Sequence, residues 1–148
     1  MSLFFENIRF QIAAICFLAI IVFSYVRMQK LALWSTRVFN CVLIGTCVNL
    51  ALDVCAVYTI THMDTVPLWV NDLFHRLFAL SLVSIMAALY IYIEAIGRKQ
   101  KRFSRVQLML RFIPYYAALG WIVFGDIYYY QGPAGVYSYG SMTTAVYV

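Results

Sequence analysis

Residues 38–60 read VFNCVLIGTCVNLALDVCAVYTI, an apolar run that holds a single charged side chain, Asp53. A helix needs about 20 apolar residues to cross about 30 Å of hydrocarbon, so this run is long enough to span a membrane. Similar runs occupy residues 10–28, 73–96 and 108–130, and another begins at Ser141. The sequence therefore predicts an all-α membrane protein with four transmembrane helices and the start of a fifth.

The overall composition supports this interpretation. Of the 148 residues, 64% are hydrophobic and 11% are charged, whereas a soluble domain is about half apolar and about a quarter charged. The net charge of +5 would suggest nucleic acid as a partner of a soluble protein. Here the basic residues lie between apolar runs, where they orient the chain in a membrane. We expect residues 1–148 to form one multi-pass domain of the cell membrane, with the lipid bilayer and no nucleic acid as partner.

The charges between the runs predict the orientation. The first loop carries Arg27, Lys30 and Arg37, and the third reads GRKQKRFSR at residues 97–105, while the second carries acids instead. Basic loops favour the cytoplasmic side, so the N-terminus is predicted to lie outside. The third loop could also bind anionic lipid headgroups. The residues expected to do so are Arg98, Lys99, Lys101 and Arg102.

Asp53 and three other polar residues form the candidate ligand or sensing site. Asn49 precedes Asp53 by one helical turn, and His75 and Arg76 reach a similar depth on the next predicted helix. A lone charge inside a membrane is costly, so Asp53 and Arg76 are expected to pair across two antiparallel helices. The pair could join the helices only, or it could belong to a ligand or proton site open to the outside. Asp72 shares a face with His75 and Arg76, either as a pH- or anion-responsive group or as an interfacial cap.

Motifs for other chemistry are absent from the sequence. The four cysteines lie inside apolar runs without a CxxC pair, so neither a disulfide framework nor a metal site is expected. No glycine-rich phosphate loop, nucleophile elbow or HExxH motif occurs. We therefore expect no catalytic residue, no metal, no cofactor and no enzymatic activity within this chain.

The outside N-terminus, the paired spans, the basic third loop and the closing GPAGVYSYG of residues 132–140 resemble a bacterial sensor region. This region is the multi-helix N-terminal part that precedes GGDEF-type diguanylate cyclase domains, and the seven-helix regions of some histidine kinases are similar. There an aromatic and glycine-rich stretch introduces the fifth helix. Here Tyr137, Tyr139 and Gly140 would do so, with Ser141 in place of a proline.

The resemblance implies a signal-input module that regulates a cytoplasmic output domain, with the chain as the N-terminal part of a longer protein. Any cyclase or kinase activity would then belong to the missing part. Such a module could also form a homodimer. The alternative is part of a small-solute transporter or a stand-alone scaffold subunit. Transporters usually have broken helices and polar residues on several spans. Because Asp53 is the only deep acid and Gly45 and Gly120 are isolated, the sequence favours the sensor.

Overall fold

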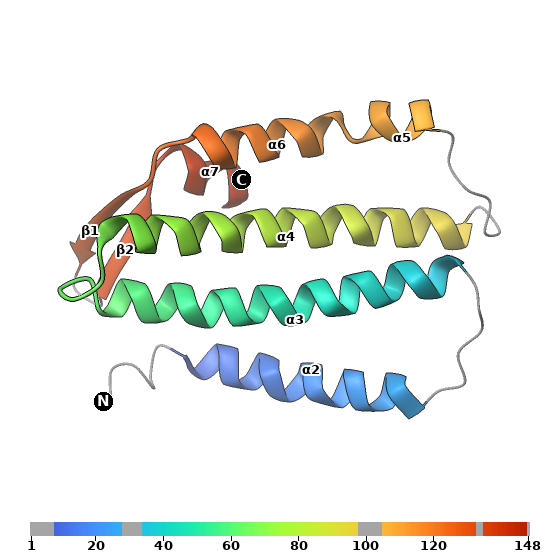
Figure 1. Cartoon of the computed structure of the whole chain (residues 1–148), viewed down its shortest axis with the longest axis horizontal. Helices are drawn as coiled ribbons and strands as arrows, with labels where there is room; N and C mark the ends of the chain where they lie inside the picture. The colour runs from blue at the N-terminus through green and yellow to red at the C-terminus, as the bar shows by residue number, and fades with distance from the viewer. Residues whose placement is uncertain (1–7, 28–33, 98–104, 133–134, 148) are drawn as a thin grey trace.

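The computed structural model describes residues 8–27, 34–97, 105–132 and 135–147. Three long helices, α2 (Arg9–Arg27), α3 (Trp34–Thr61) and α4 (Leu68–Gly97), lie side by side in chain order (Figure 1). Helices α5 (Arg105–Arg111) and α6 (Ile113–Phe124) run back along α4, on the side away from α3. The strands β1 (Tyr128–Gly132) and β2 (Gly135–Tyr139) and the short helix α7 (Ser141–Tyr147) complete the described chain.

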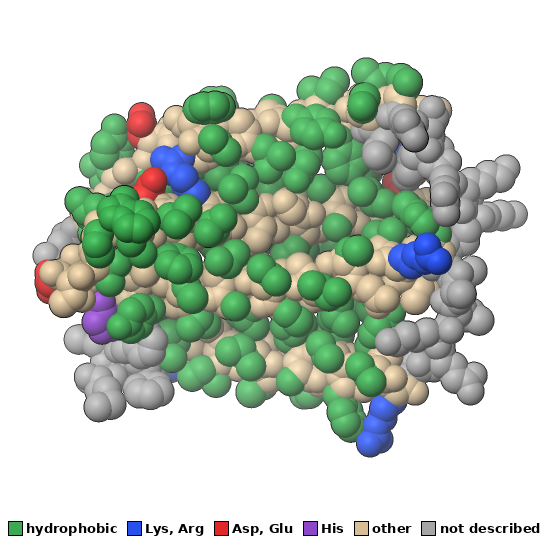
Figure 2. All heavy atoms as spheres, viewed as in Figure 1, with side chains coloured by type: hydrophobic (Ala, Val, Ile, Leu, Met, Phe, Trp, Pro, Cys, Tyr) green, Lys and Arg blue, Asp and Glu red, His purple; other side chains and the backbone are tan. Residues whose placement is uncertain are grey.

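The bundle has two ends that differ in character. The hairpin end holds the α3–α4 turn and the strands β1 and β2 (Figure 1). The basic end holds the C-terminus of α2, the N-terminus of α3 and helix α5. Apolar side chains cover the visible helix surfaces between the two ends, where a bilayer would contact them (Figure 2).

Helices α2, α3 and α4 are long and apolar enough to cross a membrane, and they confirm three of the four predicted spans. α3 begins at Trp34 rather than at 38, and α4 begins at Leu68 rather than at 73. Pro67 sets the start of α4, because its carbonyl accepts hydrogen bonds from the N–H groups of Val70 (3.0 Å) and Asn71 (3.3 Å). A proline is tolerated there because the first N–H groups of a helix have no intrahelical partner.

The prediction of a fourth helix over residues 108–130 is wrong in two respects, its continuity and its C-terminal end. It is broken at Phe112 into α5 and α6, and α6 ends at Phe124. Pro114 lies in the first turn of α6. Proline has no N–H group and its ring clashes with the carbonyl four residues earlier, so it interrupts a helix. The apolar composition alone did not reveal this break.

The prediction of an all-α fold is wrong for residues 128–132 and 135–139. These residues form an antiparallel hairpin in which Tyr128 is paired with Tyr139 and Tyr130 with Tyr137. The two pairs bring their ring centroids to 5.5 and 5.4 Å. Tyrosine favours strands, and cross-strand aromatic pairs stabilise them. The tyrosines predicted to end the fourth helix therefore build a strand instead.

The helix predicted from Ser141 is confirmed as α7. The Ser141 hydroxyl accepts a hydrogen bond from the Asp126 N–H at 2.9 Å. Met142 then packs in a buried cluster with Ala79 of α4 and Ile122 of α6. These contacts hold α7 against the α4–α6 layer.

Helices α3 and α4 form the closest pair, and α2 packs more loosely. Small residues occur on both partners: Ala56 of α3 and Ala95 of α4 are buried, and Gly45 of α3 faces Ile85 of α4. Small residues let two helix backbones approach in a membrane. Helix α2 has no buried residue along its whole length.

Gly140 is predicted to be essential for the junction between β2 and α7. Its φ is 136°, and a Cβ there would lie 2.3 Å from the Asp126 carbonyl oxygen. We expect Gly140→Ala to lower the free energy of unfolding in detergent by about 1–3 kcal/mol. Gly120→Ala is the matched control, because its Cβ would meet nothing within 4 Å, and alanine should raise helix stability by about 0.5–1 kcal/mol. Equal effects of both substitutions in thermal unfolding would contradict this account.

Candidate functional site at the hairpin end

Arg76 of α4 joins the hairpin end of α4 to the end of α6. Its Nε donates to Asp72 Oδ2 at 2.9 Å. Its Nη1 donates to the carbonyls of Ile122 (2.6 Å) and Val123 (2.8 Å), and its Nη2 donates to that of Gly125 (2.8 Å). The last carbonyls of a helix lack intrahelical partners and carry partial negative charge. The guanidinium therefore caps α6 while Asp72 balances its charge.

The predicted ion pair between Asp53 and Arg76 is wrong. Asp53 on α3 is half-buried, in hydrogen-bonding reach of the Gln11 side chain of α2 and in electrostatic range of His75. Arg76 is occupied on the other side of α4, where α6 lies. Asp53 therefore belongs to a group that connects α2, α3 and α4.

His75 lies at the centre of this group. Its Nδ1 is 2.9 Å from the Asn71 carbonyl oxygen. A carbonyl only accepts, so we assign the proton of the neutral imidazole to Nδ1, which leaves Nε2 as an acceptor. The ring meets Tyr129 of β1 edge-on, with centroids 5.6 Å apart. Asp53 and Asp72 both lie in electrostatic range of His75.

Three buried polar atoms near this group have no hydrogen-bond partner among the described residues. They are Gln11 Oε1, Asn71 Nδ2 and the Tyr129 hydroxyl. Asn71 is only 1% exposed, and its Oδ1 already accepts from the Thr59 hydroxyl at 2.9 Å. An unsatisfied buried polar group costs about 1–3 kcal/mol, so native structures rarely keep several together. We call Gln11, Asp53, Asn71, His75 and Tyr129 the polar cluster, and it has spare capacity for a hydrogen-bonding molecule.

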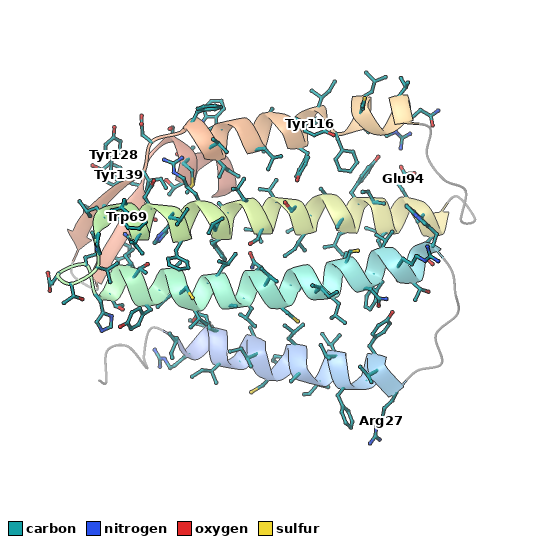
Figure 3. All side chains as sticks on the ribbon, viewed as in Figure 1. Arg27, Trp69, Glu94, Tyr116, Tyr128 and Tyr139 are labelled. Carbon is teal, nitrogen blue, oxygen red and sulfur yellow. The ribbon has the colours of Figure 1, made fainter. Side chains whose placement is uncertain are left out.

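A pocket borders the polar cluster at the hairpin end. It has a volume of about 430 Å³ and is lined in part by Trp69, Asp72, Tyr128 and Tyr129. Figure 3 shows Trp69 close to Tyr128 and Tyr139, at the end of the bundle opposite to Arg27 and Glu94. Asp72 and Tyr129 thus link this pocket to Arg76 and to the polar cluster.

Asn49, the fourth candidate, serves a different contact. Its Oδ1 accepts a hydrogen bond from the Ser81 hydroxyl of α4 at 2.6 Å. Polar bonds of this kind commonly join helices in membranes. The structure therefore brings Asp53 and His75 together, directs Arg76 of α4 to the end of α6 instead, and leaves Asn49 as a link between α3 and α4.

Some members of the polar cluster were missed by the sequence analysis. Gln11 lies at the start of the first apolar run, where an antiparallel helix would bring it level with Asp53, so this pair could have been found. Thr59 and Asn71 flank the α3–α4 turn and could have been paired in the same way. Tyr129 carried no usable signal, because its position depends on the hairpin.

The basic end has an ion pair of its own. Arg111 of α5 donates to Glu94 Oε1 of α4 at 2.6 Å and to the Tyr90 hydroxyl at 3.0 Å. Tyr90 and Glu94 raise the pKa of Arg111. The predicted headgroup-binding residues Arg98, Lys99, Lys101 and Arg102 lie outside the described residues. No group of three metal-ligating side chains occurs within the described ranges.

Comparison with known proteins gives no match to a protein family, to a curated protein or to a solved structure. The class of protein is therefore defined by the fold itself. Three candidate membrane spans, with a polar cluster at one end, indicate a multi-pass membrane protein.

Arg76→Lys is predicted to destabilise the hairpin end, because a single ammonium group cannot replace the guanidinium that reaches three carbonyls and Asp72 together. The side chain is 23% exposed, so we expect a loss of about 1.5–3 kcal/mol, the value of a hydrogen bond to a charged group. Thermal unfolding in detergent measures this loss. Arg27→Lys is the control at an exposed position and should leave the Tm unchanged; the same Tm for both variants would contradict the capping role.

Tyr129 is predicted to ionise only in strong alkali. Burial, and secondarily Asp72, raise the pKa of Tyr129 to about 12. The folded state thus favours the neutral phenol, and this contribution to stability is complete below the ordinary pKa of 10.0 and is lost as the pH rises to about 12. The ultraviolet absorbance difference between wild type and Tyr129→Phe, followed from pH 8 to pH 13, should show a midpoint near 12. A midpoint near 10.0 would show that the hydroxyl is solvated.

Proposed function

We propose that this chain is the membrane-embedded signal-input module of a receptor with a cytoplasmic output domain, such as a GGDEF diguanylate cyclase. In this proposal the chain itself performs no reaction and resides in the cell membrane. The positive-inside bias supports an outside location for the hairpin end. The resemblance of the sequence to sensor regions supports the kind of output.

The observation that carries the proposal is the Arg76 contact with the end of α6. This contact fixes one end of a short helix, α6, whose other end is the break at Phe112. The 12 residues of α6 form a rod of about 18 Å at about 1.5 Å per residue. A rod that is held at one end and broken at the other can pivot when the hold is released.

The polar cluster supplies the place where a stimulus would act. The Asp72 carboxylate forms an ion pair with Arg76 and also lies in electrostatic range of His75. A proton or ligand taken up beside His75 would change the charge next to Asp72 and Arg76. A stimulus shifts a conformational equilibrium only if it binds two packings with different affinity. The capped and released states of α6 are the two packings that we propose.

The proposal predicts coupling between the hairpin end and the basic end. Arg76→Gln removes the cap, so amide hydrogen exchange should rise at residues 122–132 in any case. If α6 acts as a lever, exchange should also rise in α5, residues 105–111, at the opposite end. Asn49→Ala is the matched control, because it removes a polar bond between α3 and α4 and leaves α6 capped.

The reverse perturbation gives a second measurement of the same coupling. Phe112 is 8% exposed and its ring meets Tyr90 and Tyr115. Because coupling between two sites is reciprocal, Phe112→Ala should raise exchange in residues 128–132 of β1. Changes confined to the mutated end in both variants would instead indicate a static scaffold and contradict the proposed function.

A further inference from the structure

A groove runs between α2 and α3, on the side of α3 away from the tight contact with α4. Its volume is about 770 Å³, and its described lining is entirely apolar side chains. They include Ile15, Ala19 and Val26 of α2 and Cys47, Ala51 and Val54 of α3. The small side chains of Ala19, Cys47 and Ala51 leave the space, because they do not reach across to the facing helix.

Polar contacts connect α2 to α3 on either side of this groove. Towards the basic end, the Tyr25 hydroxyl donates to Asn40 Oδ1 at 2.6 Å. Towards the hairpin end, Gln11 lies in hydrogen-bonding reach of Asp53. These two contacts therefore hold α2 against α3 on either side of the groove.

The length of the groove fits an acyl chain better than another helix. On α2 the lining rises about 16 Å from Ile15 to Val26, and on α3 it rises about 10 Å from Cys47 to Val54, at about 1.5 Å per residue. Each wall is therefore shorter than the roughly 30 Å of hydrocarbon in a bilayer. A transmembrane helix would need about 20 residues of contact and the full thickness.

Basic side chains lie where the headgroup of such a lipid would be. Arg27 follows the last lining residue, Val26, and its Cζ lies 4.3 Å from the centroid of Phe23, which also lines the groove. Arg37 is exposed in the first turn of α3, at the same end of the bundle. Figure 3 shows the Arg27 side chain at the last turn of α2, at the basic end.

We propose that the α2–α3 groove binds one acyl chain of an anionic phospholipid from the leaflet at the basic end. Arg27 holds the phosphate, and Arg37 adds positive charge beside it. The site is distinct from the predicted headgroup contacts of residues 98–102. It does not depend on the proposed function, because it lies on the opposite side of α3 from α6.

The test is native mass spectrometry of the full chain in detergent, titrated with phosphatidylglycerol or with phosphatidylcholine of the same acyl chains. Wild type should retain phosphatidylglycerol preferentially. Arg27→Gln should weaken phosphatidylglycerol binding by about fivefold, the contribution expected of one basic residue near a lipid headgroup. It should weaken phosphatidylcholine binding less, because the choline charge offsets the phosphate of that lipid, and Arg27→Lys should preserve the preference.

A second set of variants tests the groove itself. Ala19→Leu and Ala51→Leu fill it and should reduce the retention of both lipids. Ala13→Leu is the matched control, because Ala13 is exposed on the same helix but does not line the groove. Equal retention of the two lipids by wild type would overturn the proposal. So would a loss in Ala13→Leu as large as that in Ala19→Leu. Arg27→Gln leaves the helix packing untouched. The comparison of the two lipids with this variant therefore tests the proposal even if a leucine variant fails to fold.

Discussion

The guanidinium of Arg76 is the interaction on which the hairpin end depends. It ties α4 to the carbonyls of Ile122, Val123 and Gly125, and Asp72 neutralises it from one turn earlier on the same helix. A charge within an apolar bundle is costly unless it is paired and hydrogen-bonded. Here a single side chain meets both conditions. It also satisfies carbonyls that the end of α6 would otherwise leave exposed to an apolar environment.

The same interaction explains why several features gather at one end of the molecule. Because α6 ends under Arg76, the chain is free to form the β1–β2 hairpin and to return as α7, whose Met142 packs on Ile122. The hairpin in turn places Tyr129 against His75, and so closes the polar cluster formed by α2, α3 and α4. The groove between α2 and α3 lies apart from this assembly, which lets lipid binding and the proposed signal input be tested separately.

The sequence predicted the apolar spans well, because the length and hydropathy of a transmembrane helix are constrained by the bilayer alone. It failed at residues 108–139, where one proline and a set of cross-strand tyrosine pairs decide the structure. It identified His75, Arg76 and Asp53 as unusual, since charge in an apolar run is visible without coordinates. The predicted partner of Arg76 was wrong, because Arg76 binds backbone carbonyls at the end of a helix. Every residue type has a backbone carbonyl, so the sequence does not identify such partners. The orientation and the output domain remain predictions.

The most direct test of the central claim is nitrogen-15 NMR of the Arg76 side chain in detergent micelles that contain no phospholipid. A guanidinium held by Asp72 and three carbonyls cannot rotate freely about its Nε–Cζ bond. The account therefore predicts separate Nη1 and Nη2 signals for Arg76, with through-hydrogen-bond couplings to the carbonyl carbons of Ile122 and Gly125. The exposed Arg27 should give a single averaged signal under the same conditions. An averaged signal for Arg76 as well would show that α6 is not capped by this side chain and would contradict the account.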